Sequence, residues 1–252
     1  MTDTGSSEAN TFSIVGRCTR TGELGGAVAS AVPAVGAICL YLQSGVGAVS
    51  TQSWVNPYLA ISVLERLAAG EPTDSALSAV LADDDAAVMR QIGVIGAEGP
   101  GIARTGAGCT DWAGDKSAPD HAVQGNMLTG PEVVSAMSDA FAADPSLPLE
   151  ERLLRALEAA QTVGGDKRGR QSAAVAVIGA ELYRRVDLRV DEHSDPIAEL
   201  RRVHSVASRQ LAPFVEGMPK RGGATLPAPE DVVETLLRPP PDRPGGGGSR
   251  IP

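Results

Sequence analysis

The chain has 252 residues, of which 42% are hydrophobic, and it carries a formal net charge of −9. A chain of this length and composition can bury a sizeable core, whereas its acidity argues against binding to nucleic acid or to an anionic membrane surface. No apolar run approaches the roughly 18 residues of a membrane span, and the first ten residues lack the basic and apolar regions of a secretory signal. We therefore expect a cytoplasmic protein with neither a membrane nor a nucleic-acid partner.

Apolar strands made largely of small residues dominate the first part of the chain. Gly, Pro and Ser separate the strands predicted over 11–17, 24–32, 34–43 and 46–52. This close spacing favours antiparallel hairpins, because parallel neighbours need a crossover of about a dozen residues or more.

Helices and further strands follow in groups. Hydrophobic periodicity predicts helices over 57–70 and 73–82, strands over 90–99, 101–107 and 122–128, helices over 130–143 and 147–160, strands over 171–179 and 185–192, and a helix over 195–211. Asn56 and Thr73 are the predicted caps of the first two helices. Strand runs followed by helix pairs indicate an α+β protein with helices on the outer faces of antiparallel sheets. Two such layers would stack as a four-layer αββα sandwich.

Composition divides the chain into three parts. Residues 1–10 form a polar leader, residues 11–212 carry the main predicted elements, and residues 213–252 are rich in Pro and Gly. Such a tail cannot bury enough apolar surface to order itself, so we expect at most one weak helix in it, around 230–237.

A Gly-rich loop before the strand at 171–179 contains Asp166, Arg168 and Arg170. An arginine fork there could bind a substrate carboxylate and the aspartate could orient an ammonium group, although a solvated turn also explains such a loop. The loop lacks the Gly-Lys-Ser/Thr ending of a phosphate-binding P-loop.

Two amides, Gln124 and Asn126, lie at strand spacing and should face the same side of their strand. Spacing alone favours a hydrogen-bonded pair in the core; the functional interpretation is that Asn126 helps to form an oxyanion hole. Gln52 and Asn56 lie at a strand-to-helix turn, where capping by Asn56 ahead of Pro57 is a sufficient structural explanation.

Several other kinds of site find no support in the sequence. Cys18, Cys39 and Cys109 match neither a disulfide framework nor a zinc pattern, so reduced thiols are expected. The three histidines are far apart and no Ser lies in a nucleophile elbow, which argues against a Ser-His-Asp triad. The acidic residues and His121 that follow Cys109 lack a recognised metal spacing, and no Gly-rich run completes a dinucleotide fingerprint. We therefore expect neither a metal nor a cofactor.

A set of collinear segments resembles one protein family. The segments are TFSIVGR, TGELGGAVAS, GVGAVSTQSWVNP, TGAGCTDWAG, QGNML, GGDKRGRQSAAV and VDLRVDEH, between residue 11 and about residue 204. Together they look like the domain of unknown function 1028 family, which is placed among the N-terminal-nucleophile (Ntn) hydrolases. The resemblance implies the αββα sandwich and, less directly, an amide hydrolase, because a shared fold does not fix a substrate.

The resemblance also implies a nucleophile. In an Ntn hydrolase the side chain of the first residue attacks an amide carbonyl while its own α-amine accepts the proton. Thr11 would take that role, and Asn126 and Gln52 would polarise the carbonyl. The residues then expected to contact a small polar amide substrate are Asp166, Arg168, Arg170, Gln124 and Asn56.

The chain departs from the family pattern in two places. Relatives commonly begin Met-Thr-Phe-Ser, so that methionine removal exposes the threonine, whereas Thr11 follows the leader MTDTGSSEAN. For Thr11 to act, the Asn10–Thr11 bond must be cut, for example by attack of the Thr11 hydroxyl on the Asn10 carbonyl. Cys18 stands where relatives usually carry an acid. Nothing nearby in the sequence suggests a base or a lowered pKa, so a packed thiol is expected.

These observations leave two hypotheses open. The first is an amidohydrolase in which Thr11 becomes the nucleophile after autoprocessing. The second is a catalytically silent protein of the same fold that binds a small ligand or a partner protein and keeps the leader as a plug over the ancestral site. A structural subunit of a larger assembly, or a homodimer, is a further expectation that rests only on the tendency of sandwich folds to pair.

Overall fold

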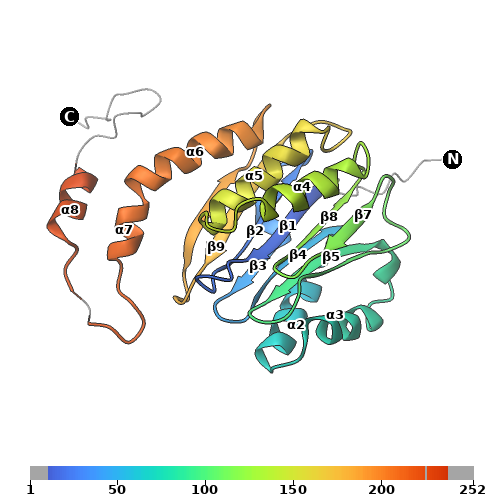
Figure 1. Ribbon diagram of the computed structural model, residues 1–252, viewed down its shortest axis with the longest axis horizontal. Coiled ribbons are helices and arrows are strands. Elements are labelled where there is room, and N and C mark those ends of the chain that lie inside the picture. The colour runs from blue at the N-terminus through green and yellow to red at the C-terminus, as the bar shows by residue number, and fades with distance from the viewer. Residues whose placement is uncertain (1–10, 225, 238–252) are drawn as a thin grey trace, which may run out of the picture. The chain divides into compact units, whose positions relative to one another are not determined.

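The structure is a computed structural model that describes residues 11–224 and 226–237. The predicted leader, residues 1–10, and the end of the predicted tail, residues 238–252, lie outside these described residues. Contacts divide the chain into a unit that ends at Leu200 and a second unit that begins at Arg201. The first unit contains both of the β-sheets seen in Figure 1.

The two sheets are antiparallel throughout, as the short connections predict. A six-stranded sheet has the order β10-β9-β2-β1-β8-β7, and a four-stranded sheet has the order β3-β4-β5-β6. The strands of the six-stranded sheet are β1 Thr11–Arg17, β2 Leu24–Ser30, β7 Gly114–Ser117, β8 His121–Asn126, β9 Ser172–Ile178 and β10 Arg184–Val190. Those of the four-stranded sheet are β3 Leu40–Gln43, β4 Gly47–Ser53, β5 Arg90–Gly96 and β6 Ile102–Thr105.

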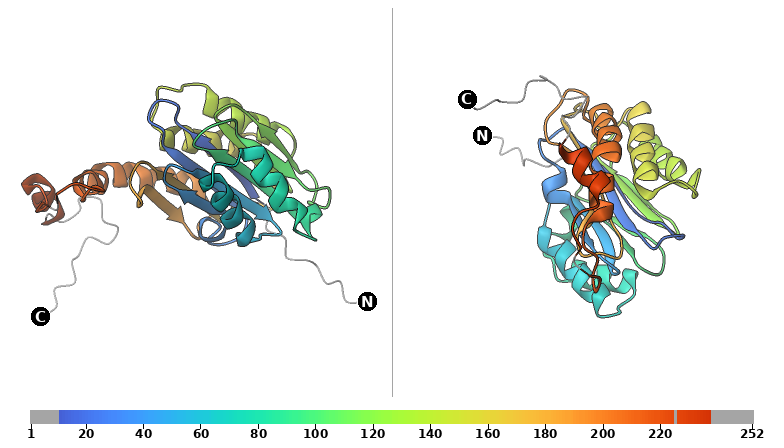
Figure 2. Two further views of the ribbon diagram at one scale, coloured as in Figure 1. Left: turned by 90° about the horizontal axis from the view of Figure 1, so that it is seen from below. Right: turned by 90° about the vertical axis from the view of Figure 1, so that its left-hand side faces the viewer.

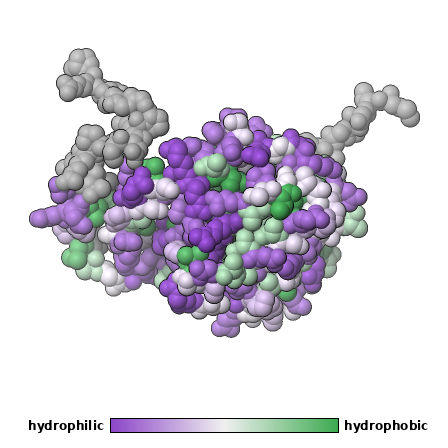
Figure 3. All heavy atoms as spheres, turned by 45° about the horizontal axis from the view of Figure 1, so that its top comes forward, coloured by the Kyte–Doolittle hydropathy of each residue, from purple (hydrophilic) through white to green (hydrophobic). Residues whose placement is uncertain are grey.

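Helices pack against both sheets. In the first unit they are α1 Gly36–Cys39, α2 Pro57–Ala68, α3 Thr73–Ala82, the 3-10 turn η1 Ala87–Met89, α4 Glu132–Ala142 and α5 Leu149–Thr162. α2 and α3 contact β4 and β5, whereas α4 and α5 contact β1, β2 and β8, on the other side of the strands (Figures 1 and 2). Mostly hydrophilic and neutral residues, with isolated hydrophobic ones, cover the face shown in Figure 3.

The two sheets face each other across a core that is apolar at one end and polar at the other. Val15, Leu24, Ala48 and Ile95 are fully or almost fully buried and pack together between the sheets. Side chains alternate along a strand, so Thr11 faces the same inter-sheet space as Val15. The start of β1 therefore lies at the polar end of this space.

The remaining helices are α6 Pro196–Gln210, which runs across the division between the units, α7 Ala212–Gly217 and α8 Glu230–Leu237. α8 matches the single helix predicted within the tail, whereas α7 was not predicted because its six residues include Pro and Gly and carry no periodic pattern. Among the described helices, none has the length and apolar character needed to cross a membrane.

The strand predicted over 34–43 is wrong in its first half, where the chain forms α1. The apolar run reads as a strand, but Ala34 has a φ of 53°, in the left-handed region, which ends any extended conformation. Gly36 then lies so close to β9 that an added Cβ would be 2.3 Å from the Ala174 Cβ. This close contact with a distant strand is not visible in the local sequence.

Two further details differ from the predictions. Thr73 is the first residue of α3 rather than its cap; Pro72 occupies the cap position and no side chain caps the helix. β7 was not predicted because the sequence GDKS is polar and exposed, and it belongs to a strand at the edge of the sheet.

A buried polar clamp fixes α4 and α5 to the six-stranded sheet. Arg152 of α5 donates to Asp120 Oδ2 at 2.9 Å and to Phe141 O at 3.0 Å, and its guanidinium lies 3.8 Å from the centre of the Phe141 ring. The His121 ring lies between Asp120 Oδ1 and Ser138 Oγ, 2.8 Å from each. Hydrogen bonding from His121 and from Arg152 outweighs partial burial and lowers the pKa of Asp120 to about 2.

We expect Asp120→Asn to destabilise the protein by about 2 kcal/mol near neutral pH, because the charged partner of His121 and Arg152 is lost. The folded-state pKa lies below the ordinary value of 3.8, so the contribution of the carboxylate is present above about pH 4 and is lost as the pH falls towards 2. Chemical denaturation of both proteins at a series of pH values measures this difference.

The matched control is Asp139→Asn, which removes an exposed partner of Lys116 and should change the unfolding free energy very little. An Asp120→Asn effect that stays constant from neutral pH down to about pH 3 would contradict the assignment of a lowered pKa to Asp120.

Candidate functional site

Thr11 is the first residue of β1 and lies in a row of polar residues that crosses the six-stranded sheet. Register pairs it with Asn126 of β8 on one side and with Ser30 of β2 on the other, and Ser30 is paired in turn with Ser172 of β9. The Thr11 hydroxyl donates to Ser30 Oγ at 3.2 Å, and the Thr11 side chain is fully buried. The predicted nucleophile is thus held in place but is not accessible.

Amides from the facing sheet approach Thr11 across the inter-sheet space. Gln52 of β4 donates through Nε2 to Thr11 O at 3.0 Å and to Gln91 Oε1 at 2.7 Å, and its own Oε1 accepts from Ser13 at 2.5 Å. Gln91 of β5 was not predicted, because a single amide in an apolar strand has no partner at strand spacing. Hydrogen bonds therefore connect the two sheets at the polar end of the core.

The orientation of Asn126 follows from that of Gln91. Gln91 Nε2 lies 2.8 Å from Gly125 O and 2.9 Å from Thr105 Oγ1, and because a backbone carbonyl can only accept, this atom must be the NH2 group. Gln91 Oε1 consequently accepts from Asn126 Nδ2 at 2.9 Å. Gln52 Nε2 donates to both Thr11 O and Gln91 Oε1, whereas Asn126 Nδ2 donates one of its two N–H groups, to Gln91 Oε1. The oxyanion-hole role of these two amides stays a prediction.

Gln124 faces the same space as Asn126, as their spacing predicts. It donates to Ser13 Oγ at 2.7 Å, and the Ser13 hydroxyl also accepts from Ser50. The carbonyl oxygens Gln124 Oε1 and Asn126 Oδ1 are both buried and have no hydrogen-bond partner. Gly93 of β5 leaves the room that Gln124 occupies, since a Cβ on Gly93 would be 2.2 Å from Gln124 Oε1.

The predicted substrate loop does reach the start of β1. Asp166 forms a bridge with Leu128, just beyond β8, and accepts a hydrogen bond from Ala31 N, just beyond β2, at 3.1 Å. Because β1 lies between β2 and β8, the loop crosses the end of the sheet where Thr11 begins. Arg168 pairs with Asp166 at 3.3 Å. The loop thus brings a buried carboxylate and a half-exposed guanidinium to this end of the sheet.

Two of the predicted substrate contacts lie elsewhere. Arg170 forms an ion pair with Asp195 at 3.4 Å, and both side chains are more than two-fifths exposed. Asn56 caps α2 by accepting from Tyr58 N at 3.1 Å, which is the structural explanation considered from the sequence. Neither residue is part of the polar end of the inter-sheet core.

Backbone strain occurs next to both amides that face Thr11. Ser53 follows Gln52 with a φ of 64°, and Met127 follows Asn126 with a φ of 49°. Non-glycine residues in the left-handed region are uncommon and are concentrated at functional sites. The strain is independent of the hydrogen bonds described above and supports the same location.

The clamp at the other end of β1 has the connectivity of a catalytic triad, which the sequence did not predict. Hydrogen bonds join Ser138 to His121 and His121 to Asp120, but Ser138, on the buried face of α4, is only 3% exposed and His121 only 2%. Arg152 donates to the second oxygen of the Asp120 carboxylate, Oδ2. Each of these groups is paired, and Ser138, His121 and Arg152 are buried, so the cluster has a structural role.

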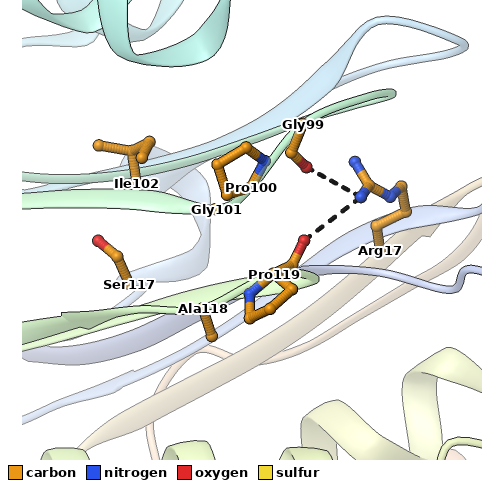
Figure 4. A pocket seen from close by; sticks show the side chains of 8 residues that line it. All are labelled: Arg17, Gly99, Pro100, Gly101, Ile102, Ser117, Ala118 and Pro119. Atoms are coloured by element: carbon orange, nitrogen blue, oxygen red, sulfur yellow. Dashed lines mark hydrogen bonds between the residues drawn. The ribbon is translucent and has the colours of Figure 1, made fainter.

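A shallow pocket of about 500 Å³ also lies away from Thr11 (Figure 4). Its wall includes Arg17, six residues along β1 from Thr11, which corresponds to about 20 Å. The Arg17 guanidinium is tied to the carbonyls of Gly96, Gly99 and Pro119. Arg17 therefore joins two loops, and the pocket is not the predicted site.

The three cysteines are free, as predicted, and all are buried. Burial raises the pKa of Cys39 to about 12. Cys18 differs from the prediction: burial alone would raise its pKa, but hydrogen bonds from Thr21 and from the backbone of Arg20 outweigh this effect and lower it. Cys18 follows the far end of β1 and takes no part in the Thr11 row. Within the described part of the chain, no three His, Cys, Asp or Glu side chains gather as metal ligands would.

Comparison with known proteins places the sequence in a family context. Residues 11–200 match the model of a family of unknown function (DUF1028). The crystal structure of protein SPO2555 from Silicibacter pomeroyi, assigned to the same family model, is similar with a TM-score of 0.78 and 30% identity over 84% of this chain and 92% of that chain. No curated protein matches the sequence.

Two weaker similarities are to Anbu proteins, the first of which is described as an ancestral beta-subunit. The protein from Yersinia bercovieri has a TM-score of 0.40 and 13% identity over 85% of this chain and 100% of that chain. A Gly-1 mutant from Hyphomicrobium sp. strain MC1 has a TM-score of 0.37 and 14% identity over 83% and 99%. These low scores do not establish a shared fold.

Gly93→Ala should destabilise the protein by about 1–3 kcal/mol, because the new methyl group would overlap the Gln124 carboxamide and displace its Nε2 from Ser13 Oγ. In a Gln124→Ala background the same substitution should cost much less, so that a double-mutant cycle gives a clear coupling energy. Chemical denaturation measures all four proteins.

Gly179→Ala serves as the control, since a Cβ there would lie no nearer than 3.7 Å to a neighbouring atom. Additive effects of the Gly93 and Gln124 substitutions would contradict the packing described for this pair.

Proposed function

Because the chain belongs to the family of unknown function DUF1028, we propose that it is the precursor of an amide hydrolase of the Ntn type. Thr11 becomes the nucleophile when residues 1–10 are removed. The substrate is a small polar amide, and the two antiparallel sheets with helices packed against both support an αββα sandwich as the architecture.

One observation carries this proposal: Thr11 begins a central strand and is held on three sides by polar groups. Ser30 binds its hydroxyl, Gln52 binds its carbonyl, and Asn126 lies opposite it in register with an unpartnered oxygen. Partners for the Thr11 hydroxyl and carbonyl would also suit a structural threonine, but the unpartnered Asn126 oxygen is not explained by a structural role, because an unsatisfied buried polar atom destabilises a protein.

The chemistry needs only the threonine, its α-amine and water. The α-amine takes the proton of the hydroxyl as Thr11 Oγ1 attacks the amide carbon, and the C–N bond breaks as that proton passes to the leaving nitrogen. The acyl group remains on Thr11 as an ester until water hydrolyses it to a carboxylic acid. The Ser30 hydroxyl, 3.2 Å from Oγ1, positions the nucleophile, and Arg168 can bind a carboxylate on the substrate.

The burial of Thr11 favours activation by cleavage over activity of the uncut chain. With residue 10 attached, the nitrogen of Thr11 is an amide and cannot act as a base. The same burial also favours the second candidate function, a catalytically silent protein that keeps its leader and binds a small ligand. The two candidates differ in whether the Asn10–Thr11 bond is cut.

Intact-mass analysis and amino-terminal sequencing of the full-length protein and of Thr11→Ala test for cleavage. We expect the wild-type chain to begin at Thr11 and the variant to stay uncut. A chain made to begin at Thr11 by cleavage of a fusion should hydrolyse N-acetylglycine to acetate and glycine, because the free α-amine is then present. Thr11→Ala in that shortened chain should lower the rate by about 10³-fold or more.

Thr11→Ser in the shortened chain is the matched control, since it keeps a hydroxyl nucleophile and should retain measurable activity. Absence of turnover by a folded chain that begins at Thr11, tested on amides with and without a carboxylate, would leave the silent binding protein as the better account.

A further inference from the structure

Asn126 Oδ1 is a fixed hydrogen-bond acceptor that has no partner among the residues the structure describes. The residue is fully buried, and the oxygen has no partner. The side chain cannot simply turn over, because its NH2 is needed by Gln91 Oε1, whose own orientation is set by Gly125 O. Asn126 Oδ1 therefore has an unused capacity to accept a hydrogen bond, which the donor of a bound ligand would fill.

This acceptor lies beside the nucleophile. Asn126 and Thr11 are paired directly across β8 and β1, so their Cβ atoms are about 4.5–5.5 Å apart and their side chains face the same inter-sheet space. When Thr11 Oγ1 attacks a carbonyl carbon, the nitrogen of that amide is one bond away from the reacting carbon. An N–H at that nitrogen is then within reach of the Asn126 side chain.

We propose that Asn126 Oδ1 accepts a hydrogen bond from the N–H of the scissile amide and selects secondary amides over the corresponding esters. The inference deepens the proposed function and rests on it for the position of the substrate. An ester places an oxygen lone pair where the amide has its N–H, so two acceptors would face each other in a buried space. A site built to bind an N–H rejects an analogue that lacks it.

Gln124 offers a built-in comparison. Its carbonyl oxygen is also buried and unpartnered, and its NH2 is also engaged, with Ser13. Gln124 Oε1, however, abuts Gly93 of the facing sheet, and Gln124 is two register pairs further along the strands from Thr11 than Asn126 is. It should therefore have no influence on the choice between amide and ester.

Three ligands test the proposal by binding alone: N-acetylglycine, its ester analogue O-acetylglycolate, and N-acetylsarcosine, in which a methyl replaces the amide hydrogen. All three carry the carboxylate that Arg168 can bind, so this contact is constant. Titration calorimetry with Thr11→Ala protein, both full-length and beginning at residue 11, gives the affinities without turnover. In the form that binds, we expect N-acetylglycine to bind about tenfold or more tightly than either analogue.

Asn126→Leu should reduce this preference to about twofold or less, whereas Gln124→Met should leave it unchanged. Asn126→Asp keeps an acceptor oxygen and should keep the preference, so the proposal remains testable if the leucine variant does not fold. Equal affinities for the three ligands in the parent protein, no binding of any of them to either form, or an unchanged preference in Asn126→Leu would overturn it.

Turnover separates this inference from the proposed function. If the chain beginning at Thr11 hydrolyses amides but the binding preference is absent, the role of Asn126 is wrong and the hydrolase remains. If the preference is present and depends on Asn126 but no ligand is hydrolysed, the acceptor role is upheld and the hydrolase is wrong.

Discussion

The carboxamide of Gln91 determines what the polar end of the inter-sheet space can bind. Its NH2 faces the carbonyl of Gly125, which can only accept, so its own carbonyl must face Gln52 and Asn126. Both of these amides are turned by that single constraint, and the carbonyl of Asn126 is left without a partner. In a low-dielectric space, a chain of such hydrogen bonds holds each member in one orientation. Gln91 therefore determines that an acceptor, Asn126 Oδ1, is the group left without a partner next to Thr11.

The two ends of the central strand show how a buried polar cluster that stabilises differs from one that can bind. At the far end, Arg152, Asp120 and His121 satisfy one another between the sheet and its helices. At the near end, the network closes around Thr11 but leaves Asn126 incomplete, with a strained residue directly after it. Triad-like connectivity is therefore a weaker sign of function here than an unmet hydrogen-bonding capacity next to a positioned hydroxyl.

Much of the fold could be predicted from the sequence, because alternating apolar residues and short turns define strands and antiparallel pairing locally. The site could be predicted only where its residues share a strand, as Gln124 and Asn126 do. Gln91 carries no local signal, since its partners come from β4, β6 and β8. Helix α1 was missed for the same reason, because Gly36 packs closely against Ala174, which lies on β9, far along the chain.

The groups that surround Thr11 determine both its hydrogen bonds and its accessibility. Ser30 and Asn126 flank it within the sheet, Gln52 reaches it from the facing sheet, and the loop of Asp166 crosses the end of the strands. Under the proposed function, a cut at the Asn10–Thr11 bond would supply the α-amine that an Ntn nucleophile needs, whereas retention of the bond leaves an amide nitrogen there. The polar groups around Thr11 are compatible with both proposals, a precursor and a silent binding protein, and cleavage at this bond distinguishes them.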